Sequence, residues 1–354
     1  MIKDQPFVSI LIPVFNSLPY IREAMDSILN QTYINFEVVI INDGSNDGTE
    51  QILRNYASKH QSIKLIEQEN HGYCAALNCG IEYCRGKYVA RMDSDDIMHP
   101  QRIELQVKFM EENPDVSILG SAIQYIDENG NLGRCHYYPK STSISSMIFD
   151  ESPVAHPSSF MRKDLFLQIG KYRANLYPAE DYDLWLRAFS ANIKIENLQK
   201  ILLFYRVHNK NTSLNNLSRR AYASICAQRA CQLRLNNLED QLDGVDVMSG
   251  SYFDLLPVNL RPSEMEIFCL VNSSIANIEL PKVLKEYNSI RFQNEDAQFR
   301  ILFLLRVAFH QFMNFKVMSG ISYYILSLFI SPKITILISI DKFSSRKRFR
   351  ISNS

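Results

Sequence analysis

Short apolar runs alternate with amphipathic segments through the first 120 residues, and this alternation constrains the fold more than any other feature of the chain. Continuous apolar runs such as Phe7–Val14 are typical of strands buried on both faces. Strands are expected at residues 7–14, 36–41, 63–68, 87–92 and 116–120, and helices at residues 17–31, 49–60, 75–84 and 100–113. Short strand–helix connections of this kind predict a doubly wound, mostly parallel α/β sheet flanked by helices.

Start and turn signals refine this pattern. Ser17 is placed to cap the first helix, and Pro100 stands at the first helical position of the fourth. The pair Asn129-Gly130 predicts a hairpin over residues 123–137. Residues 155–160 are expected to be extended, 179–191 helical and 201–207 a strand. From residue 214 the pattern is mainly helical, so we expect one domain over residues 1–213 and a helical C-terminal region over 214–354.

Polar residues follow the first four strands directly. The four loops contain Asn16, residues 42–45, residues 70–72 and residues 93–96. In open α/β sheets, ligands collect where the carboxyl ends of the strands meet. The sequence therefore predicts one binding site at this edge of the sheet, built from all four loops.

The fourth loop is the most informative, because it places Asp93, Asp95 and Asp96 directly after a short apolar strand. Crowded carboxylates repel one another and lose solvation, so a positive group is expected among them. A hard divalent cation, which takes oxygen ligands and carries substrate phosphates, would satisfy this requirement. Helix capping explains one of these acids but not all three, and Asp96 is interpreted as structural.

Three other positions could carry chemistry. Asp43 could accept a hydrogen bond from a pyrimidine ring or form an ordinary Asx turn. The pair Glu180-Asp181 could supply a general base or only interact favourably with a helix dipole. His208 follows Arg206 by two residues, so both would project from one face of a strand, where a phosphate or a metal would suit them.

Seven motifs occur together in order and carry a family resemblance. They are Ser9-Ile-Leu-Ile-Pro-Val-Phe-Asn16, Asn42-Asp-Gly-Ser45, Asn70-His-Gly72, Arg91-Met-Asp-Ser-Asp-Asp96, His156-Pro157, Glu180-Asp-Tyr-Asp-Leu-Trp185 and Tyr205-Arg-Val-His208. With these motifs the chain resembles family 2 inverting glycosyltransferases, which have the GT-A fold. The resemblance covers residues 7 to 213, and the C-terminal third has no motif of this family.

The resemblance implies a function and a role for each site residue. A sugar would move from a nucleoside-diphosphate sugar, with uracil as the implied base, to a hydroxyl of a glycan or polyprenyl-linked acceptor in surface polysaccharide biosynthesis. The implied residues are Pro13, Phe15, Asp43 and Asp93 for the nucleotide; Asp93, Asp95 and His208 for Mn²⁺ or Mg²⁺; and Asp181 as catalytic base with Glu180 beside it.

Two other functions stay open at this point. A nucleotidyltransferase that makes nucleotide sugars uses a similar sheet but would place a glycine-rich, basic loop after strand one, where this chain has Pro13 to Asn16. A non-catalytic sugar-nucleotide binding module would need no base at Asp181. The lack of a glycine-rich fingerprint after strand one argues against a dehydrogenase. The net charge of zero argues against a nucleic-acid partner.

The ends of the chain give expectations about location. Residues 1–6 are polar and no cleavage-type site follows, which predicts a cytoplasmic protein. Near the other end, Val317–Ile330 is shorter than the roughly 20 residues of a spanning helix. With the basic residues that follow, residues 317–350 are expected to form either a peripheral, in-plane attachment to the inner face of the plasma membrane or a buried core helix.

Overall fold

The computed structural model describes residues 5–208, 217–247 and 255–257. The chain divides into two compact units, residues 1–215 with 226–252, and residues 216–225 with 253–354. The first unit contains every predicted site residue. The boundary between residues 213 and 214 stays a prediction, and the expected tail attachment at residues 317–350 lies outside the described residues. In the part of the chain that the structure describes, no helix is long and apolar enough to cross a membrane.

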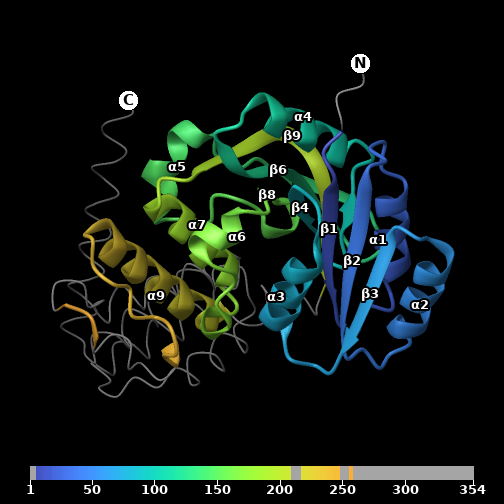
Figure 1. Ribbon diagram of the computed structural model, residues 1–354, viewed down its shortest axis with the longest axis horizontal. Coiled ribbons are helices and arrows are strands. Elements are labelled where there is room, and N and C mark those ends of the chain that lie inside the picture. The colour runs from blue at the N-terminus through green and yellow to red at the C-terminus, as the bar shows by residue number, and fades with distance from the viewer. Residues whose placement is uncertain (1–4, 209–216, 248–254, 258–354) are drawn as a thin grey trace, which may run out of the picture. The chain divides into compact units, whose positions relative to one another are not determined.

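Nine strands, counted over the described residues, form one sheet in the order β3-β2-β1-β4-β8-β6-β9-β5, with β7 paired to β6 (Figure 1). Their bounds are β1 Val8–Val14, β2 Phe36–Asp43, β3 Ile63–Gln68, β4 Tyr88–Arg91, β5 Ile97–Met98, β6 Val116–Ile126, β7 Leu132–His136, β8 Phe160–Arg162 and β9 Lys194–Arg206. The first four strands are parallel to one another. Beyond β4 the sheet becomes mixed, because β8 runs antiparallel to both β4 and β6.

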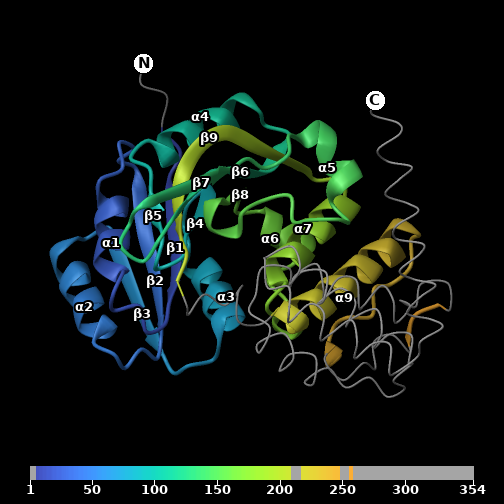
Figure 2. The ribbon, with the colours of Figure 1, turned by 180° about the vertical axis from the view of Figure 1, so that it is seen from behind.

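The helices connect and cover these strands. Their bounds are α1 Ile21–Leu29, α2 Thr49–Lys59, α3 Tyr73–Tyr83, α4 Arg102–Glu112, α5 Ser141–Met147, α6 Leu165–Ile169, α7 Glu180–Ser190 and α9 Leu217–Leu235, with short 3-10 helices at His156–Ser158 and Ala174–Leu176. Both views show α1 and α2 on one side of strands β1 to β3 and α3 on the other (Figures 1 and 2).

Side chains of β1 and β2 alternate between these two layers. Ile10 and Ile12 belong to a core that also contains the apolar faces of α1, α2 and α4. Leu11 and Ile41 face α3 so closely that a Cβ atom at Gly80 would lie 2.2 Å from Leu11 Cδ1. Because helices cover both faces, nearly every residue of these strands is buried. This explains why the strands read as unbroken apolar runs.

The predicted strands and helices of the first half are confirmed, with differences at their ends. Helix α1 begins at Ile21 with Tyr20 at its N-cap, so Ser17 does not cap it; the Ser17 hydroxyl lies 2.6 Å from Ser94 Oγ. Helix α4 begins at Arg102, two residues after Pro100. The hairpin around Asn129-Gly130 is confirmed by the antiparallel pairing of β6 and β7.

Two predicted segments of the middle region differ from the structure. Residues 155–160 were expected to be extended but contain the 3-10 helix His156–Ser158. The strand expected at residues 201–207 is the end of the longer β9, which begins at Lys194. Its polar first half shows no strand pattern, and it is strand only because it pairs in parallel with β6.

A buried carboxylate links β1, β2 and the turn before β4. Glu37 accepts hydrogen bonds from Ser9 Oγ (2.7 Å) and from the backbone N–H and Nε of Arg85 (2.7 and 2.8 Å). Burial alone would raise the pKa of Glu37, but these hydrogen bonds bring the pKa below its ordinary value. The carboxylate is therefore stabilised in its charged form.

We expect Glu37→Gln to lower the free energy of unfolding by about 2 kcal/mol at pH 7, because charge-assisted hydrogen bonds are lost. A lowered folded-state pKa contributes stability that is present above the unfolded pKa, about 4.3, and is lost as the pH falls through the folded pKa. The difference between the two proteins should therefore narrow below about pH 4. Urea denaturation between pH 3 and 8 measures it, with the exposed Glu112→Gln as control; a difference that does not change with pH would contradict the assignment.

Candidate active site

Hydrogen bonds join the four polar loops at the carboxyl edge of β1 to β4. Asn16 receives a hydrogen bond from the Asn46 backbone (2.9 Å), which ties the first loop to the second. The contact between Ser17 and Ser94 ties the first loop to the acidic turn. Asp43 accepts hydrogen bonds from the backbone N–H groups of His71 and Gly72, which ties the second loop to the third. The predicted convergence of these loops at one edge of the sheet is confirmed.

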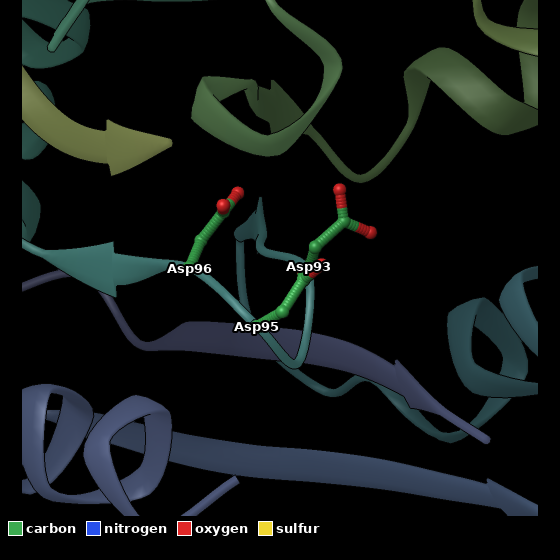
Figure 3. Close-up of side chains that lie close together, drawn as sticks. All are labelled: Asp93, Asp95 and Asp96. Carbon is green, nitrogen blue, oxygen red and sulfur yellow. The ribbon is translucent and has the colours of Figure 1, made fainter. Parts of the chain in front are cut away.

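The carboxyl groups of Asp93, Asp95 and Asp96 project from a single turn between β4 and β5 (Figure 3). One oxygen of each lies within 4.8 Å of the others. Asp96 is only 1% exposed, and its Oδ1 accepts a hydrogen bond from the Arg206 backbone (2.9 Å). Burial, followed by the charges of Asp95 and Asp93, raises the pKa of Asp96 well above its ordinary value. These contacts support the interpretation of Asp96 as a structural residue.

Arginines of the protein itself supply positive charge around this turn. Arg91 binds Asp93 through both oxygens, with Nη1 2.9 Å from Oδ2 and Nη2 2.5 Å from Oδ1. Arg206 donates from Nε to the backbone oxygen of Asp95 (2.9 Å). Arg102 donates to the backbone oxygen of Arg91 (2.8 Å). All three arginine side chains are among the largest fully buried ones, so the positive groups expected among these acids include guanidinium groups of the protein itself.

This arrangement predicts that metal is not needed for folding. We expect EDTA-treated protein to unfold cooperatively on heating. Its midpoint should lie within about 2 °C of that of untreated protein in metal-free buffer, which corresponds to a change of less than about 1 kcal/mol in the free energy of unfolding for a domain of this size. Differential scanning calorimetry with far-UV circular dichroism measures it. Loss of the cooperative transition on chelation would show that the buried arginines do not suffice.

Asp95 and His208 form the pair that suits a divalent cation best. Asp95 Oδ2 lies 2.8 Å from His208 Nε2, although 113 positions separate the two residues. The antiparallel pairing of β5 with β9 brings the end of β9 beside the acidic turn. A carboxylate and an imidazole are both ligands that Mn²⁺ accepts. Asp93 is engaged by Arg91 and also accepts a hydrogen bond from the Tyr73 hydroxyl (3.0 Å), so its oxygens are less available to a metal.

The residues predicted to hold the nucleotide lie at the ends of β1 and β2. Pro13 is buried, whereas the Phe15 side chain just after β1 is 49% exposed. Asp43 is buried and accepts hydrogen bonds from the backbone N–H groups of His71 and Gly72 (2.9 Å each) and from Gln68 Nε2 (2.7 Å). Asp43 therefore holds the third loop in place.

Asp43 does not form the Asx turn that was its alternative role, and its neighbour closes the turn after β2. Asn42 Oδ1 accepts a hydrogen bond from the Ser45 backbone (3.2 Å), which closes the turn after β2. Asp43 itself makes its hydrogen bonds with the loop after β3. Its carboxylate is thus positioned by tertiary contacts, and its role toward a nucleotide base stays a prediction.

Glu180 and Asp181 open α7 and lie in different environments. Glu180 is 5% exposed, its Oε1 lies 3.9 Å from His156 Nδ1, and its Oε2 has no hydrogen-bond partner. Burial, with the neighbouring charge of Asp181, raises the pKa of Glu180 to about 8. Asp181 is partly exposed, and its Oδ1 accepts a hydrogen bond from the Tyr182 backbone (2.8 Å). At neutral pH, Glu180 is therefore mainly protonated.

Tyr73 and His156 connect α7 with the acidic turn. The Tyr73 ring packs edge-on against the His156 ring at 6.3 Å, and its hydroxyl donates to Asp93. His156 Nε2 lies 2.9 Å from the Tyr172 hydroxyl. Burial, followed by the charge of Arg91, lowers the pKa of His156 well below its ordinary value, so the ring is neutral. Tyr73 follows the Asn70-His-Gly72 motif directly, and that position was the one signal by which sequence reasoning could have found it.

Comparison with known proteins agrees with this geometry. The family model "Glycosyl transferase family 2" matches residues 9–170. An uncharacterised glycosyltransferase of Methanocaldococcus jannaschii is 34% identical over 222 residues, which cover 61% of this chain and 76% of that protein. The O-antigen biosynthesis glycosyltransferase WbnJ of Escherichia coli is 36% identical over 214 residues, which cover 60% of this chain and 84% of that protein.

Solved structures share the fold at low sequence identity. The mannosyltransferase PcManGT of Pyrobaculum calidifontis, in complex with GDP-Man and Mn²⁺, matches with a TM-score of 0.53 at 16% identity, over 93% of this chain and 89% of that one. TarS 1-349 of S. aureus, in complex with UDP-GlcNAc, matches with a TM-score of 0.51 at 18% identity, over 91% of each chain. These matches show that the sheet has the GT-A fold. The chain belongs to glycosyltransferase family 2.

Proposed function

We propose that this enzyme is a metal-dependent, inverting glycosyltransferase that uses a nucleoside-diphosphate sugar, with UDP as the nucleotide. The observation that carries the proposal is the pair Asp95–His208, held at the edge where the four polar loops meet. The presence of Mn²⁺ and GDP-Man in the PcManGT complex, and of UDP-GlcNAc in the TarS complex, supports a donor of this class.

The nucleotide would lie across the ends of β1 and β2. The exposed Phe15 ring offers a surface for the base beside Pro13, and Asp43 offers its remaining carboxylate lone pair. Asp93 is oriented by Arg91 and Tyr73, so its oxygens could accept hydrogen bonds from the ribose hydroxyls. Asp95 and His208 would hold Mn²⁺ or Mg²⁺, with a carboxylate oxygen of Asp93 within 4.8 Å of one of Asp95. A bound divalent ion supplies positive charge that offsets the charge building on the leaving diphosphate.

Asp181 would take the proton of the attacking hydroxyl. A general base must lie within reach of the substrate hydroxyl, and Asp181 is partly exposed at the start of α7. Glu180 is mainly protonated near pH 7, so it is suited to orient neighbouring groups as a neutral carboxylic acid rather than to accept the proton. A single displacement with one base leads to inversion at the anomeric carbon.

A panel of UDP-, GDP- and dTDP-sugars tests the proposal. We expect Mn²⁺-dependent release of the nucleoside diphosphate from at least one donor, faster than from the same donor with EDTA. Formation of a nucleotide sugar from a sugar phosphate and a nucleoside triphosphate would favour the nucleotidyltransferase. Tight donor binding without turnover, even with a range of glycan acceptors, would favour the binding module.

The acceptor and the location of the enzyme are further parts of the proposal. WbnJ acts in O-antigen biosynthesis, which supports a glycan or polyprenyl-linked acceptor in surface polysaccharide assembly. An acceptor of this kind would be met on the inner face of the plasma membrane. The proposed peripheral contact through residues 317–350 would hold a cytoplasmic enzyme at that surface.

A further inference from the structure

Arg206 occupies an unusual place beside the acidic turn. It is the last residue of β9, and its side chain is only 1% exposed. The guanidinium is therefore engaged inside the protein, whereas His208, two residues later, faces Asp95. Ile97 of β5, which directly follows the acidic turn, pairs with Phe204 of β9. This pairing places Arg206, two residues after Phe204, next to the acidic turn.

Arg206 holds the turn from two sides. Its backbone N–H donates to Asp96 Oδ1 (2.9 Å), and its Nε donates to the backbone oxygen of Asp95 (2.9 Å). The first hydrogen bond fixes the end of the turn, and the second fixes the peptide that carries the Asp95 side chain. The direction of the Asp95 carboxylate therefore depends on the position of the Arg206 backbone and guanidinium together.

The rest of the guanidinium binds two other segments of the chain. Nη1 donates to the backbone oxygens of Asp127 (3.2 Å) and Glu128 (3.3 Å) in the turn between β6 and β7. Nη2 donates to the carboxylate of Glu23 on α1. One buried side chain thus joins the acidic turn, the β6–β7 hairpin and helix α1.

Tyr20 extends this arrangement to the second predicted metal ligand. The Arg206 guanidinium lies over the Tyr20 ring at 4.7 Å, and the same ring stacks on His208 at 5.0 Å. Both members of the Asp95–His208 pair are therefore oriented by contacts that begin at Arg206. Groups that orient ligands in this way commonly affect metal affinity by about 10- to 100-fold.

We propose that Arg206 is a positioning residue that preforms the Asp95–His208 pair for a divalent cation and does not itself touch the substrate. The inference rests on the proposed metal-dependent function. Its chemistry requires arginine, because a planar guanidinium with five donors can reach the peptide oxygens and the Glu23 carboxylate at once. Lysine keeps the charge but has a single ammonium group, so it cannot hold all three segments.

The test is Arg206→Lys against a matched control, Arg187→Lys. Arg187 is also a buried arginine; it pairs with Asp183 (2.8 Å) and donates to backbone oxygens at residues 169, 170 and 171, but it makes none of these contacts with the acidic turn. Binding of Mn²⁺ to the full-length protein is measured from the loss of the free-ion electron paramagnetic resonance signal, with Mn²⁺ alone and with UDP present. Thermal unfolding of each variant is recorded in parallel.

We expect Arg206→Lys to weaken Mn²⁺ binding by about tenfold or more and Arg187→Lys to leave it within about twofold, even where both lower the melting temperature. Equal Mn²⁺ affinity of the two variants would overturn the inference and leave the proposed function standing. A wild-type protein that leaves all Mn²⁺ free would overturn both.

A milder variant covers the case in which Arg206→Lys does not fold. Glu23→Gln removes the carboxylate partner of Arg206 at a side chain that is 59% exposed, so the fold should survive. We expect Mn²⁺ affinity to weaken by about two- to threefold, because glutamine keeps a hydrogen-bond acceptor for the guanidinium but removes the charge that strengthens this contact. Unchanged affinity in this variant would count against the inference.

Discussion

Asp181→Asn should reduce sugar transfer by about a hundred- to ten-thousand-fold while UDP binding in the presence of Mn²⁺ stays within about threefold of wild type. The physical reason is that an amide cannot accept the proton of the attacking hydroxyl, although it has nearly the same shape as the carboxylate. Release of nucleoside diphosphate from the active donor gives the rate, and isothermal titration with UDP and Mn²⁺ gives the affinity.

Glu180→Gln is the matched control for this experiment. Glu180 neighbours Asp181, but its pKa of about 8 means that the neutral form predominates near pH 7, and glutamine resembles that form. We expect a loss of less than about tenfold. If Glu180→Gln removed activity as fully as Asp181→Asn, or if Asp181→Asn weakened UDP binding equally, the division of roles between the two residues would be refuted.

Asp95→Asn should weaken binding of Mn²⁺ by at least about 100-fold, more than the loss of an orienting neighbour would cost. An amide oxygen is a poorer and uncharged ligand, and His208 would lose the carboxylate partner that lies 2.8 Å away. Transfer should fall in parallel and recover in part at high Mn²⁺ concentration. The same resonance measurement used for Arg206 gives the affinity.

The exposed acid Asp115, which pairs with Lys194 on the surface, serves as the control for this variant. Asp115→Asn changes the net charge by the same amount and should leave Mn²⁺ affinity unchanged. Equal affinity in Asp95→Asn and wild type would place the cation elsewhere, and the assignment of the Asp95–His208 pair would fail.

The sequence predicted the parallel part of the sheet well because its signals are local. Strands β1, β2 and β4 are mainly apolar, and each strand of β1 to β4 is followed by polar residues that form the loops at one edge. The mixed part of the sheet, beyond β4, was harder to predict. Strand β8 has three residues, β5 has two, and the first half of β9 is polar, so none of them has a pattern that stands alone.

The site divides in the same way. The sequence alone predicts the cluster of acids after β4 and the position of Glu180 and Asp181 at the start of a helix. Three other features depend on segments that are far apart in the sequence. They are the contact of Asp95 with His208, the hydrogen bonds by which Asp43 holds the loop after β3, and the burial of Glu180 beside His156. The raised pKa of Glu180 arises first from burial, which no local motif records.

The amino-acid sequence by itself determined which edge of the sheet carries the polar site residues. Apolar periodicity and the ends of strands are local patterns, set by residues that are neighbours along the chain. The tertiary structure decided how the charge of the acidic turn is balanced. Three buried arginines from β4, α4 and β9 surround Asp93, Asp95 and Asp96, and only folding brings them together. Electrostatic compensation acts through space over a few ångströms, so it is set by packing and not by order in the chain.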